Sequence, residues 1–249
     1  MLEYKNCLLL KEKLNLIVGK RIYPLKNKGT GEVGMLLEKL LGITANSFPI
    51  ADLNGIELKV NSINSTYPIT LFSCVFDGPD LFELKRIIDK YGMNVNNEFN
   101  SKVLYVHAYS NFFSAWGRFL MFKLSFDDNH SKLFLTIAHS NKKIIEKKAY
   151  WEYSTLFSIL ERKLKIVCFI SSKRSYIGGV SFVEFVDYKF LKLKSFDDFI
   201  MCLRTGKVFV NINCGIYKFG SRMGHSYNHG VLFQIKKEHI FDLFDSLDI

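Results

Sequence analysis

The chain has 249 residues, of which 48% are hydrophobic and 15% are aromatic. This composition predicts a folded protein with a large core and excludes a mainly disordered chain. No apolar run reaches the roughly 18 residues that a membrane-spanning helix needs. The first ten residues include an acid and a lysine and do not resemble a signal peptide. We therefore expect a cytoplasmic protein that does not bind a membrane.

Basic residues outnumber acidic residues by 34 to 24, which gives a net charge of +10. A basic chain favours a polyanionic partner such as DNA, because each neutralised phosphate releases condensed counterions. A lysine-rich composition can also follow from an AT-rich genome, so charge alone does not identify the partner. The five cysteines are scattered and form no C-x2-C pair, which predicts buried free thiols and not a zinc site.

The hydrophobic pattern predicts helices and strands along the whole chain. In the first part we expect helices over residues 4–17, 32–41 and 79–91, and strands over 56–63 and 69–75. In the remainder we expect strands over 103–107, 119–126, 132–139, 164–171, 180–186, 208–213 and 231–235, and helices over 151–163, 196–204 and 237–247. There is no internal repeat and no clear linker, so we expect an α/β fold of the α+β, mixed-sheet type with two lobes around a cleft.

A set of acidic residues and a lysine stands at the start of the first predicted strand pair. Asp52, Glu57 and Lys59 have the spacing D-x4-E-x-K, and Glu38 lies on the helix before them. An acid followed two residues later by a lysine is common, with roughly three occurrences expected by chance in such a chain. Glu57 and Lys59 differ from the other pairs because they lie in an apolar, strand-like run that follows a turn carrying an aspartate.

The strand geometry places these groups in one site. Residues two apart on a strand face the same side, so Glu57 and Lys59 point together while Ile56 and Leu58 pack behind them. Asp52 can approach the same point from the turn. Carboxylates hold a hard divalent cation and a lysine can orient water, which is the chemistry of a Mg²⁺-dependent phosphodiester hydrolase. The alternative is a charged strand edge that faces solvent.

The segment G-x-V-G-M-L-L-E-K-L-L-G together with D-L-N-G-I-E-L-K resembles the active-site region of the MutH-like nucleases, a branch of the restriction-endonuclease-like superfamily with D-(x)n-(D/E)-x-K sites. The short D-x4-E spacing is more similar to the MvaI/BcnI type of restriction endonucleases than to the mismatch-repair nickase. Residues 68–73, 149–165 and 215–233 extend the resemblance in the same order, and residues 92–148 match least.

The resemblance implies a role for each residue of the set. Asp52 and Glu57 become Mg²⁺ ligands, and Leu58 between Glu57 and Lys59 belongs to the same metal-binding set. Lys59 orients water or stabilises charge, and Glu38 completes the metal shell directly or through water. The implied reaction is hydrolysis of a DNA phosphodiester, which leaves a 5′-phosphate and a 3′-hydroxyl.

The resemblance also implies an organisation for the whole chain. Residues 1–249 form a single MutH-like endonuclease domain. Its catalytic lobe covers roughly 1–91 and 149–171, its DNA-recognition lobe covers roughly 172–249, and the contribution of 92–148 is left open. We expect a monomer that acts on double-stranded DNA, beside a cognate DNA methyltransferase with which it forms no stable complex.

The glycine- and histidine-rich segment 215–230 is the candidate for DNA recognition. Its side chains and those of the neighbouring strands that can reach bases or phosphates are Asn213, Arg222, His225, Tyr227, His229 and Gln234. A metal site at His225 and His229 would need a helix, which the nearby glycines disfavour, and a simple polar hairpin is the other alternative. In the resembled family this hairpin carries an H-x-H pair, of which His229 matches the second member while Tyr227 replaces the first.

Asn213 and Gln234 stand where those relatives often carry arginine. Arginine recognises guanine, whereas asparagine and glutamine suit adenine, so the relatives' GC-rich target is not transferred. Lys163 and Lys165 flank a predicted strand, and phosphate contact is one interpretation of them. The sequence thus predicts a Type II restriction endonuclease. A strand-specific repair nickase and a non-catalytic DNA-binding module are the alternatives.

Overall fold

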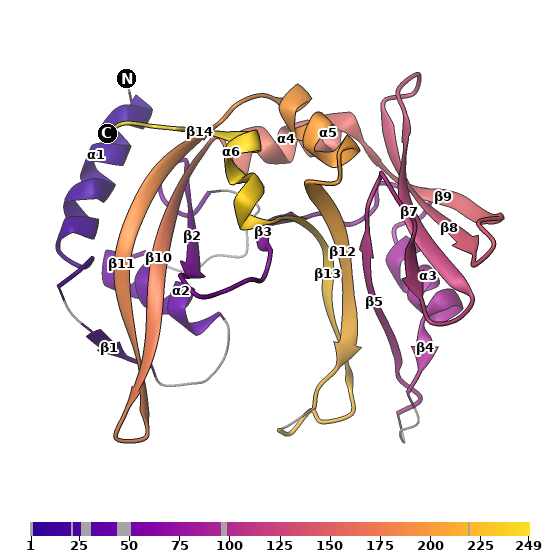
Figure 1. Cartoon of the computed structure of the whole chain (residues 1–249), viewed down its shortest axis with the longest axis horizontal. Helices are drawn as coiled ribbons and strands as arrows, with labels where there is room; N and C mark the ends of the chain where they lie inside the picture. Colours follow the sequence, from indigo (N-terminus) through magenta and orange to yellow (C-terminus); the bar gives the residue numbers. More distant parts are fainter. Residues whose placement is uncertain (1, 21, 26–30, 44–50, 96–98, 219) are drawn as a thin grey trace. The chain divides into compact units, whose positions relative to one another are not determined.

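The computed structural model describes residues 2–20, 22–25, 31–43, 51–95, 99–218 and 220–249. The chain divides into two compact units (Figure 1). Unit 1 comprises Met1–Tyr67, Ile159–Ser195 and Ile240–Ile249, and unit 2 comprises Pro68–Ser158 and Phe196–His239. Both units combine helices with β-sheet, which confirms the expected mixed α/β class.

Unit 1 is built on one mixed sheet with the strand order β1-β11-β10-β2, in which β14 also pairs with β11. Its elements are α1 (Leu2–Asn15), β1 (Ile22–Pro24), α2 (Glu32–Leu41), β2 (Ile56–Ser62), β10 (Ile166–Ile177), β11 (Val180–Leu193), α6 (Ile240–Leu243) and β14 (Phe244–Ser246), together with the end of α4 (Tyr153–Lys163). β2 runs parallel to β10 and lies at one end of the strand order, so one of its backbone edges is unpaired within this sheet.

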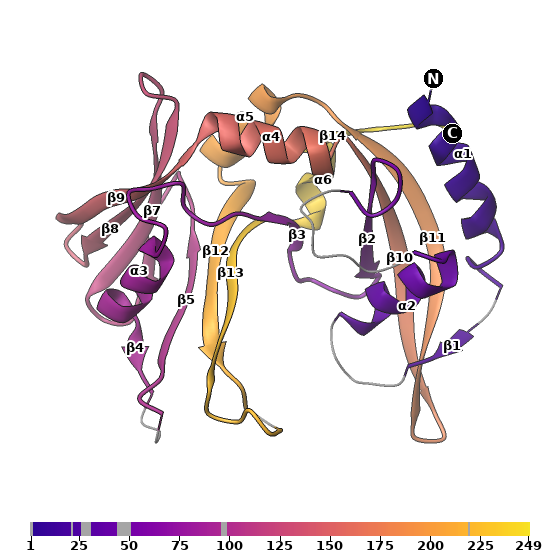
Figure 2. The ribbon, with the colours of Figure 1, turned by 180° about the vertical axis from the view of Figure 1, so that it is seen from behind.

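Two helices cover the sheet of unit 1, as Figure 2 shows from behind. Apolar side chains recur at helical spacing in α1, at Cys7, Leu10 and Leu14, and all three are fully buried. Leu37 and Leu41 of α2 join the same core. Helix α2 ends at Gly42, whose left-handed conformation (φ 72°) lets its N–H bond to the carbonyls of the last turn.

Unit 2 contains two antiparallel sheets, with the strand orders β3-β13-β12-β5-β4 and β6-β7-β8-β9. Its strands are β3 (Ile69–Ser73), β4 (Met93–Asn94), β5 (Lys102–Ala108), β6 (Ser114–Trp116), β7 (Leu120–Asp127), β8 (Lys132–His139), β9 (Ile144–Glu152), β12 (Val208–Ile216) and β13 (Ser226–Ile235). Its helices are α3 (Glu83–Tyr91), α5 (Phe196–Arg204), the 3-10 turn η1 (Lys237–His239) and most of α4. An aromatic cluster forms its core, where Trp151 contacts Phe76 and Phe233.

Several expectations are confirmed and others are corrected by these elements. All five cysteines are buried and free, as expected. Among the described residues, none of the helices is both long and apolar enough to cross a membrane. The helix expected over 237–247 is too long, because a 3-10 turn (η1) and a single α-helical turn (α6) end at Leu243 and Phe244–Ser246 pairs with β11 as a strand.

The boundaries of the two compact units differ from those of the expected lobes. Residues 68–91 and 149–158 belong to unit 2, although the sequence grouped them with the catalytic lobe. Residues 172–195 and 240–249 belong to unit 1, because β10, β11 and β14 continue the sheet that contains β2. Which unit performs which function stays a prediction.

Candidate active site

Glu57 and Lys59 lie side by side on β2, as the strand alternation predicts. The Lys59 Nζ atom is 2.6 Å from Glu57 Oε1. The same carboxylate oxygen is 3.3 Å from the Nζ atom of Lys163, at the end of α4. Glu57 is only 3% exposed, so two ammonium groups meet one buried carboxylate oxygen.

A tight turn explains how Asp52 reaches this strand. Leu53 and Ile56 form an antiparallel bridge with two backbone hydrogen bonds of 3.0 and 2.8 Å. Asn54 and Gly55 between them both have positive φ angles, 48° and 88°, which is the hairpin conformation that an Asn-Gly pair favours. The chain reverses here, and the Leu58 N–H donates a 2.8 Å hydrogen bond to Asp52 Oδ2.

The unpaired edge of β2 faces Asp52. The N–H of Ile63, just after β2, donates to the Ser172 carbonyl of β10. The backbone N–H and C=O groups of the odd-numbered residues of β2 therefore face β10, and those of the even-numbered residues face the open edge. The N–H and the C=O of one strand residue point to the same side, so the Leu58 carbonyl shares the open edge with the Leu58 N–H that binds Asp52. The three residues expected to hold a metal therefore contribute oxygen atoms around one end of β2.

The second oxygen of Glu57 has no hydrogen-bond partner. Glu57 Oε2 is buried, and no described side chain or backbone group bonds to it. Burial raises the pKa of Glu57, the Lys59 ammonium opposes this effect, and the Asp52 carboxylate adds to it. An unpaired buried carboxylate oxygen is unfavourable by itself and is a suitable ligand for a cation.

Glu38 on α2 belongs to the same electrostatic group. Burial raises its pKa, and the Asp52 and Glu57 carboxylates raise it further. The described residues contain no group of three or more histidine, cysteine or acidic side chains close enough to hold a metal ion alone. A cation here would need ligands of another kind beside the carboxylates, and the Leu58 carbonyl and water are of that kind.

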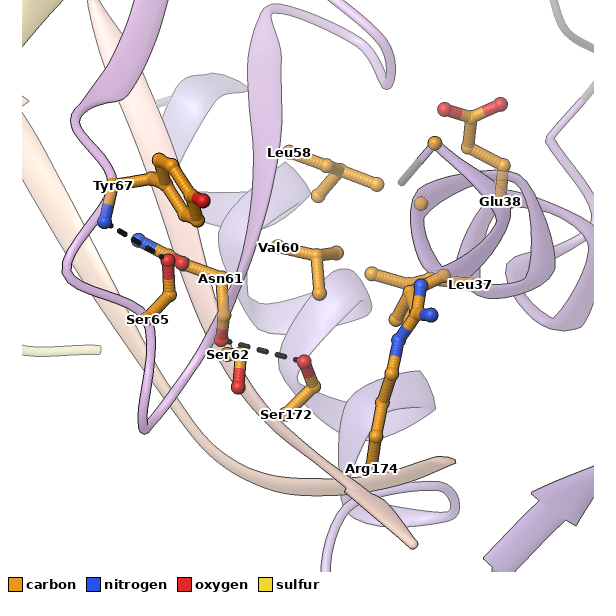
Figure 3. Close-up of a pocket in the computed structure, with 13 residues that line it drawn as sticks. Leu37, Glu38, Leu58, Val60, Asn61, Ser62, Ser65, Tyr67, Ser172 and Arg174 are labelled. Atoms are coloured by element: carbon orange, nitrogen blue, oxygen red, sulfur yellow. Dashed lines mark hydrogen bonds between the residues drawn. The ribbon is translucent and has the colours of Figure 1, made fainter. Parts of the chain in front are cut away.

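A cavity of about 420 Å³ lies between α2 and β2 in unit 1. Figure 3 shows Leu58 and Val60 pointing from β2 toward α2, where Leu37 lies. Glu38 and Arg174 also line this cavity. The apolar side chains thus fill the face of β2 opposite Glu57 and Lys59, which fixes the direction of the two charged groups.

The candidate recognition residues lie on β12, β13 and the hairpin between them. Arg222, His225 and His229 are exposed, and the Tyr227 hydroxyl lies 2.9 Å from the Tyr105 hydroxyl of β5. Asn213 is half-buried, and its Oδ1 atom has no partner among the described residues. His229 lies in strand β13 and His225 just before it, so the helical spacing that a metal site would need is not formed.

Gln234 does not fit the predicted role in DNA recognition. It is only 8% exposed, its Nε2 donates to the Thr70 hydroxyl at 2.9 Å, and its Oε1 accepts from Asn211 at 3.1 Å. Both halves of the amide are therefore used to link β3, β12 and β13. The sequence also gave no sign of Tyr105, which lies in the segment that resembles the relatives least.

Comparisons with known proteins identify the fold and the family of the chain. No curated protein sequence matches the chain. Two solved structures are similar over nearly their whole length, with 21% identity in each case. One, described as "Restriction endonuclease MvaI-cognate DNA substrate complex", has a TM-score of 0.89 with 96% of both chains covered. The other, described as "Restriction endonuclease MvaI in the absence of DNA", has a TM-score of 0.59 with 97% of this chain and 96% of that chain covered.

At this identity the two structures establish the fold. The sequence itself matches the family described as the MvaI/BcnI restriction endonuclease family over residues 11–244. Because this match spans nearly the whole chain, the chain belongs to the MvaI/BcnI restriction endonuclease family.

Proposed function

We propose that this Type II restriction endonuclease hydrolyses phosphodiester bonds of double-stranded DNA with Mg²⁺, through Asp52, Glu57, Lys59 and Glu38. Restriction endonucleases generally use a divalent metal ion, and oxygen ligands of the kind present here suit Mg²⁺. The observation that carries the proposal is the buried and unpaired Oε2 atom of Glu57, beside Asp52 on the open edge of β2.

The proposed metal ligands are the carboxylates of Asp52 and Glu57 and the carbonyl oxygen of Leu58. When bound, Mg²⁺ would polarise the scissile phosphate and lower the pKa of water. The Leu58 N–H holds Asp52 in place through its hydrogen bond. The Lys59 ammonium holds Glu57, and from the same face of β2 it can orient the attacking water and stabilise charge on the phosphate.

Glu38 and Lys163 have supporting roles in the proposal. Glu38, whose pKa is raised, can accept a proton from water near Asp52 or complete the metal shell through water. Lys163 contacts Glu57 and balances its charge, so it positions the carboxylate. The expected products carry a 5′-phosphate and a 3′-hydroxyl.

Recognition of the DNA sequence is assigned to the hairpin of β12 and β13. Arg222, His225 and His229 are exposed there, and Asn213 and Tyr227 are half-buried. A solved relative is described as a complex with cognate DNA, which supports double-stranded DNA as the substrate. We further propose a monomer that acts in the cytoplasm beside a cognate methyltransferase and forms no stable complex with it.

The test is digestion of unmethylated genomic and plasmid DNA by titrated protein, with and without Mg²⁺, beside the Lys59→Ala variant. Discrete fragments that require Mg²⁺ and vanish in the variant are the expected result, and the fragment ends give the cut position. Nicked circles alone would instead indicate a strand-specific nickase. Binding without cleavage across several divalent metals would leave a DNA-binding module and contradict the proposal.

A further inference from the structure

An open hollow of about 600 Å³ lies on the polar face of the larger sheet of unit 2. It is formed by β5, β12 and β13, with β6 at its border. The side chains that matter for its chemistry are Tyr105, His107, Asn211, Asn213, Tyr227 and Ser114. Among the described residues, the lining contains no lysine, arginine or acidic residue, so the hollow is suited to a neutral polar group and not to a phosphate.

Two oxygen atoms in this lining lack partners. Asn213 Oδ1 and Ser114 Oγ are both buried, and neither forms a hydrogen bond with any described residue. By contrast, the neighbouring Asn211 bonds to Gln234 at 3.1 Å. A buried acceptor without a donor is unfavourable in the free protein, which indicates that a donor from outside completes the site.

A pair of tyrosines forms the other wall of the hollow. The Tyr105 and Tyr227 hydroxyls are 2.9 Å apart, and one hydrogen atom of the pair remains available for a third partner. Glycine is needed beneath them, because a Cβ atom at Gly215 would lie 1.5 Å from Tyr105 Oη and 2.6 Å from Tyr227 Oη. Burial, and after it the hydrogen bond to Tyr227, raises the pKa of Tyr105 to about 12, so the Tyr105 hydroxyl keeps its proton at neutral pH.

From these contacts we infer that the hollow is the specificity site for an adenine in the DNA target, with Asn213 accepting from the adenine amino group and the Tyr105–Tyr227 pair at its side. The inference rests on the proposed function, which supplies DNA as the ligand. In the major groove, adenine presents an amino donor next to the N7 acceptor, and an asparagine amide can bond to both. Guanine presents two acceptors there, which would face the Asn213 oxygen without a donor.

The test uses the Lys59→Ala protein as the parent, so that binding is measured without cleavage. Duplexes retained by this protein from a randomised pool are sequenced and compared with those retained by Lys59→Ala/Asn213→Ala. The expected consensus contains an adenine whose preference falls at least about fivefold in the second protein, while the other positions are unchanged. The nearly isosteric Asn213→Asp keeps the acceptor but not the donor. Because an aspartate accepts from the cytosine amino group, the preferred base at that position should change from adenine toward cytosine.

A modified base provides a control that does not depend on the folding of a variant. Replacing the consensus adenine by purine, which lacks the 6-amino group, should weaken binding by the parent about fivefold or more. It should not weaken binding by the Asn213→Ala protein further. A consensus without adenine, a preference unchanged by both substitutions, or no enrichment at all overturns the inference. Cleavage of the selected duplex by the wild-type protein is measured separately, so a failure of the proposed catalysis is distinguished from a failure of this site.

Discussion

Glu57 is the residue on which the charges of the candidate active site converge. One of its oxygens contacts Lys59 and Lys163, and the other has no partner among the described residues. Two ammonium groups on one oxygen hold the carboxylate in a fixed orientation and leave Oε2 for another ligand. The two lysines are nevertheless not equivalent, because Lys59 shares the strand face with Glu57 whereas Lys163 approaches from the end of α4.

The first prediction separates these two lysines. Lys59→Ala should lower the single-turnover cleavage rate by about 10² to 10³-fold, because a group that stabilises charge in the transition state is removed. Lys163→Ala should lower the rate by about tenfold or less, because only a contact to Glu57 is lost. DNA affinity, measured without metal, should change little in either variant. Equal loss of rate in both variants would contradict the assignment of Lys59 to the reaction itself.

The second prediction concerns stability without metal. Burial raises the pKa of Glu57, so the folded state holds this proton more tightly than the unfolded state does. The free energy of unfolding should therefore fall as the pH rises from about 4.5 through the raised pKa, since the folded state must then accept a buried charge. Glu57→Gln should make the free energy of unfolding fall less steeply with pH. The part of the fall that is due to Glu38, whose pKa is also raised, should remain.

The third prediction concerns Glu57 as a metal ligand and uses the effect of added Mg²⁺ on stability. Mg²⁺ at millimolar concentration should raise the melting temperature of the wild-type protein near neutral pH, because it binds the folded state alone. Glu57→Gln should lose this increase. Glu161→Gln, at an exposed position of α4, is the matched control and should keep it. An increase of equal size in Glu57→Gln and the wild-type protein would rule out Glu57 as a ligand.

At the scale of elements, a charged network fixes helix α3 to strand β9. Glu146 of β9 is buried and accepts hydrogen bonds from Arg86, from Lys90 at 3.1 Å and from the Tyr91 hydroxyl at 2.8 Å. Burial alone would raise the pKa of Glu146, but the bonds from Arg86, Tyr91 and Lys90 outweigh burial and lower the pKa to about 2. The hydrogen bonds from Arg86, Lys90 and Tyr91 replace those that the Glu146 carboxylate would make to water. The carboxylate can therefore stay charged although it is buried against α3.

The fourth prediction follows from this lowered pKa. The contribution of Glu146 to stability is present above its unfolded pKa of about 4.5 and is lost as the pH falls toward 2. After allowance for solvent screening it amounts to about 1–2 kcal/mol. Glu146→Gln should lower the free energy of unfolding by this amount at pH 7 and by much less near pH 2, measured in urea. A difference that is the same at both pH values would indicate lost packing and not lost charge.

Local signals account for the part of the site that the sequence could predict. The alternation along β2 predicted that Glu57 and Lys59 face one side, and the turn before the strand predicted that Asp52 approaches it. Both follow from neighbours in the chain, and both are observed. The residue types themselves indicated a divalent-metal site, whereas the Type II classification and the role of each residue came from the resemblance.

Contacts between distant segments account for what the sequence did not predict. Tyr105 meets Tyr227 across 122 positions of the chain, and no local pattern indicates that pairing. Gln234 was assigned to DNA from its position alone, but its amide is used by Thr70 and Asn211 from other strands. Phe244 begins a strand because β11 lies beside it, although its own segment has the periodicity of a helix.

At the scale of the whole molecule, the described residues contain one set of the D-x4-E-x-K type with this geometry. A monomer with one such site can cut only one strand for each placement of the substrate. Cleavage of both strands then requires two successive reactions, with a change in the orientation of the protein on the DNA between them. A dimer with two sites would not need this change.

The last prediction follows from that difference. With limiting enzyme, a supercoiled plasmid that carries one recognition site should pass through a nicked circle before the linear form appears. The rate should rise in proportion to enzyme concentration, because no second subunit has to assemble. The protein alone should sediment at the 28.9 kDa of one chain. Rapid formation of linear DNA without a nicked intermediate, with a rate that rises as the square of concentration, would require two active sites on the DNA at once. That result would contradict the proposed monomer. It would not change the proposed roles of Asp52, Glu57 and Lys59, because each active site would still hydrolyse its own strand.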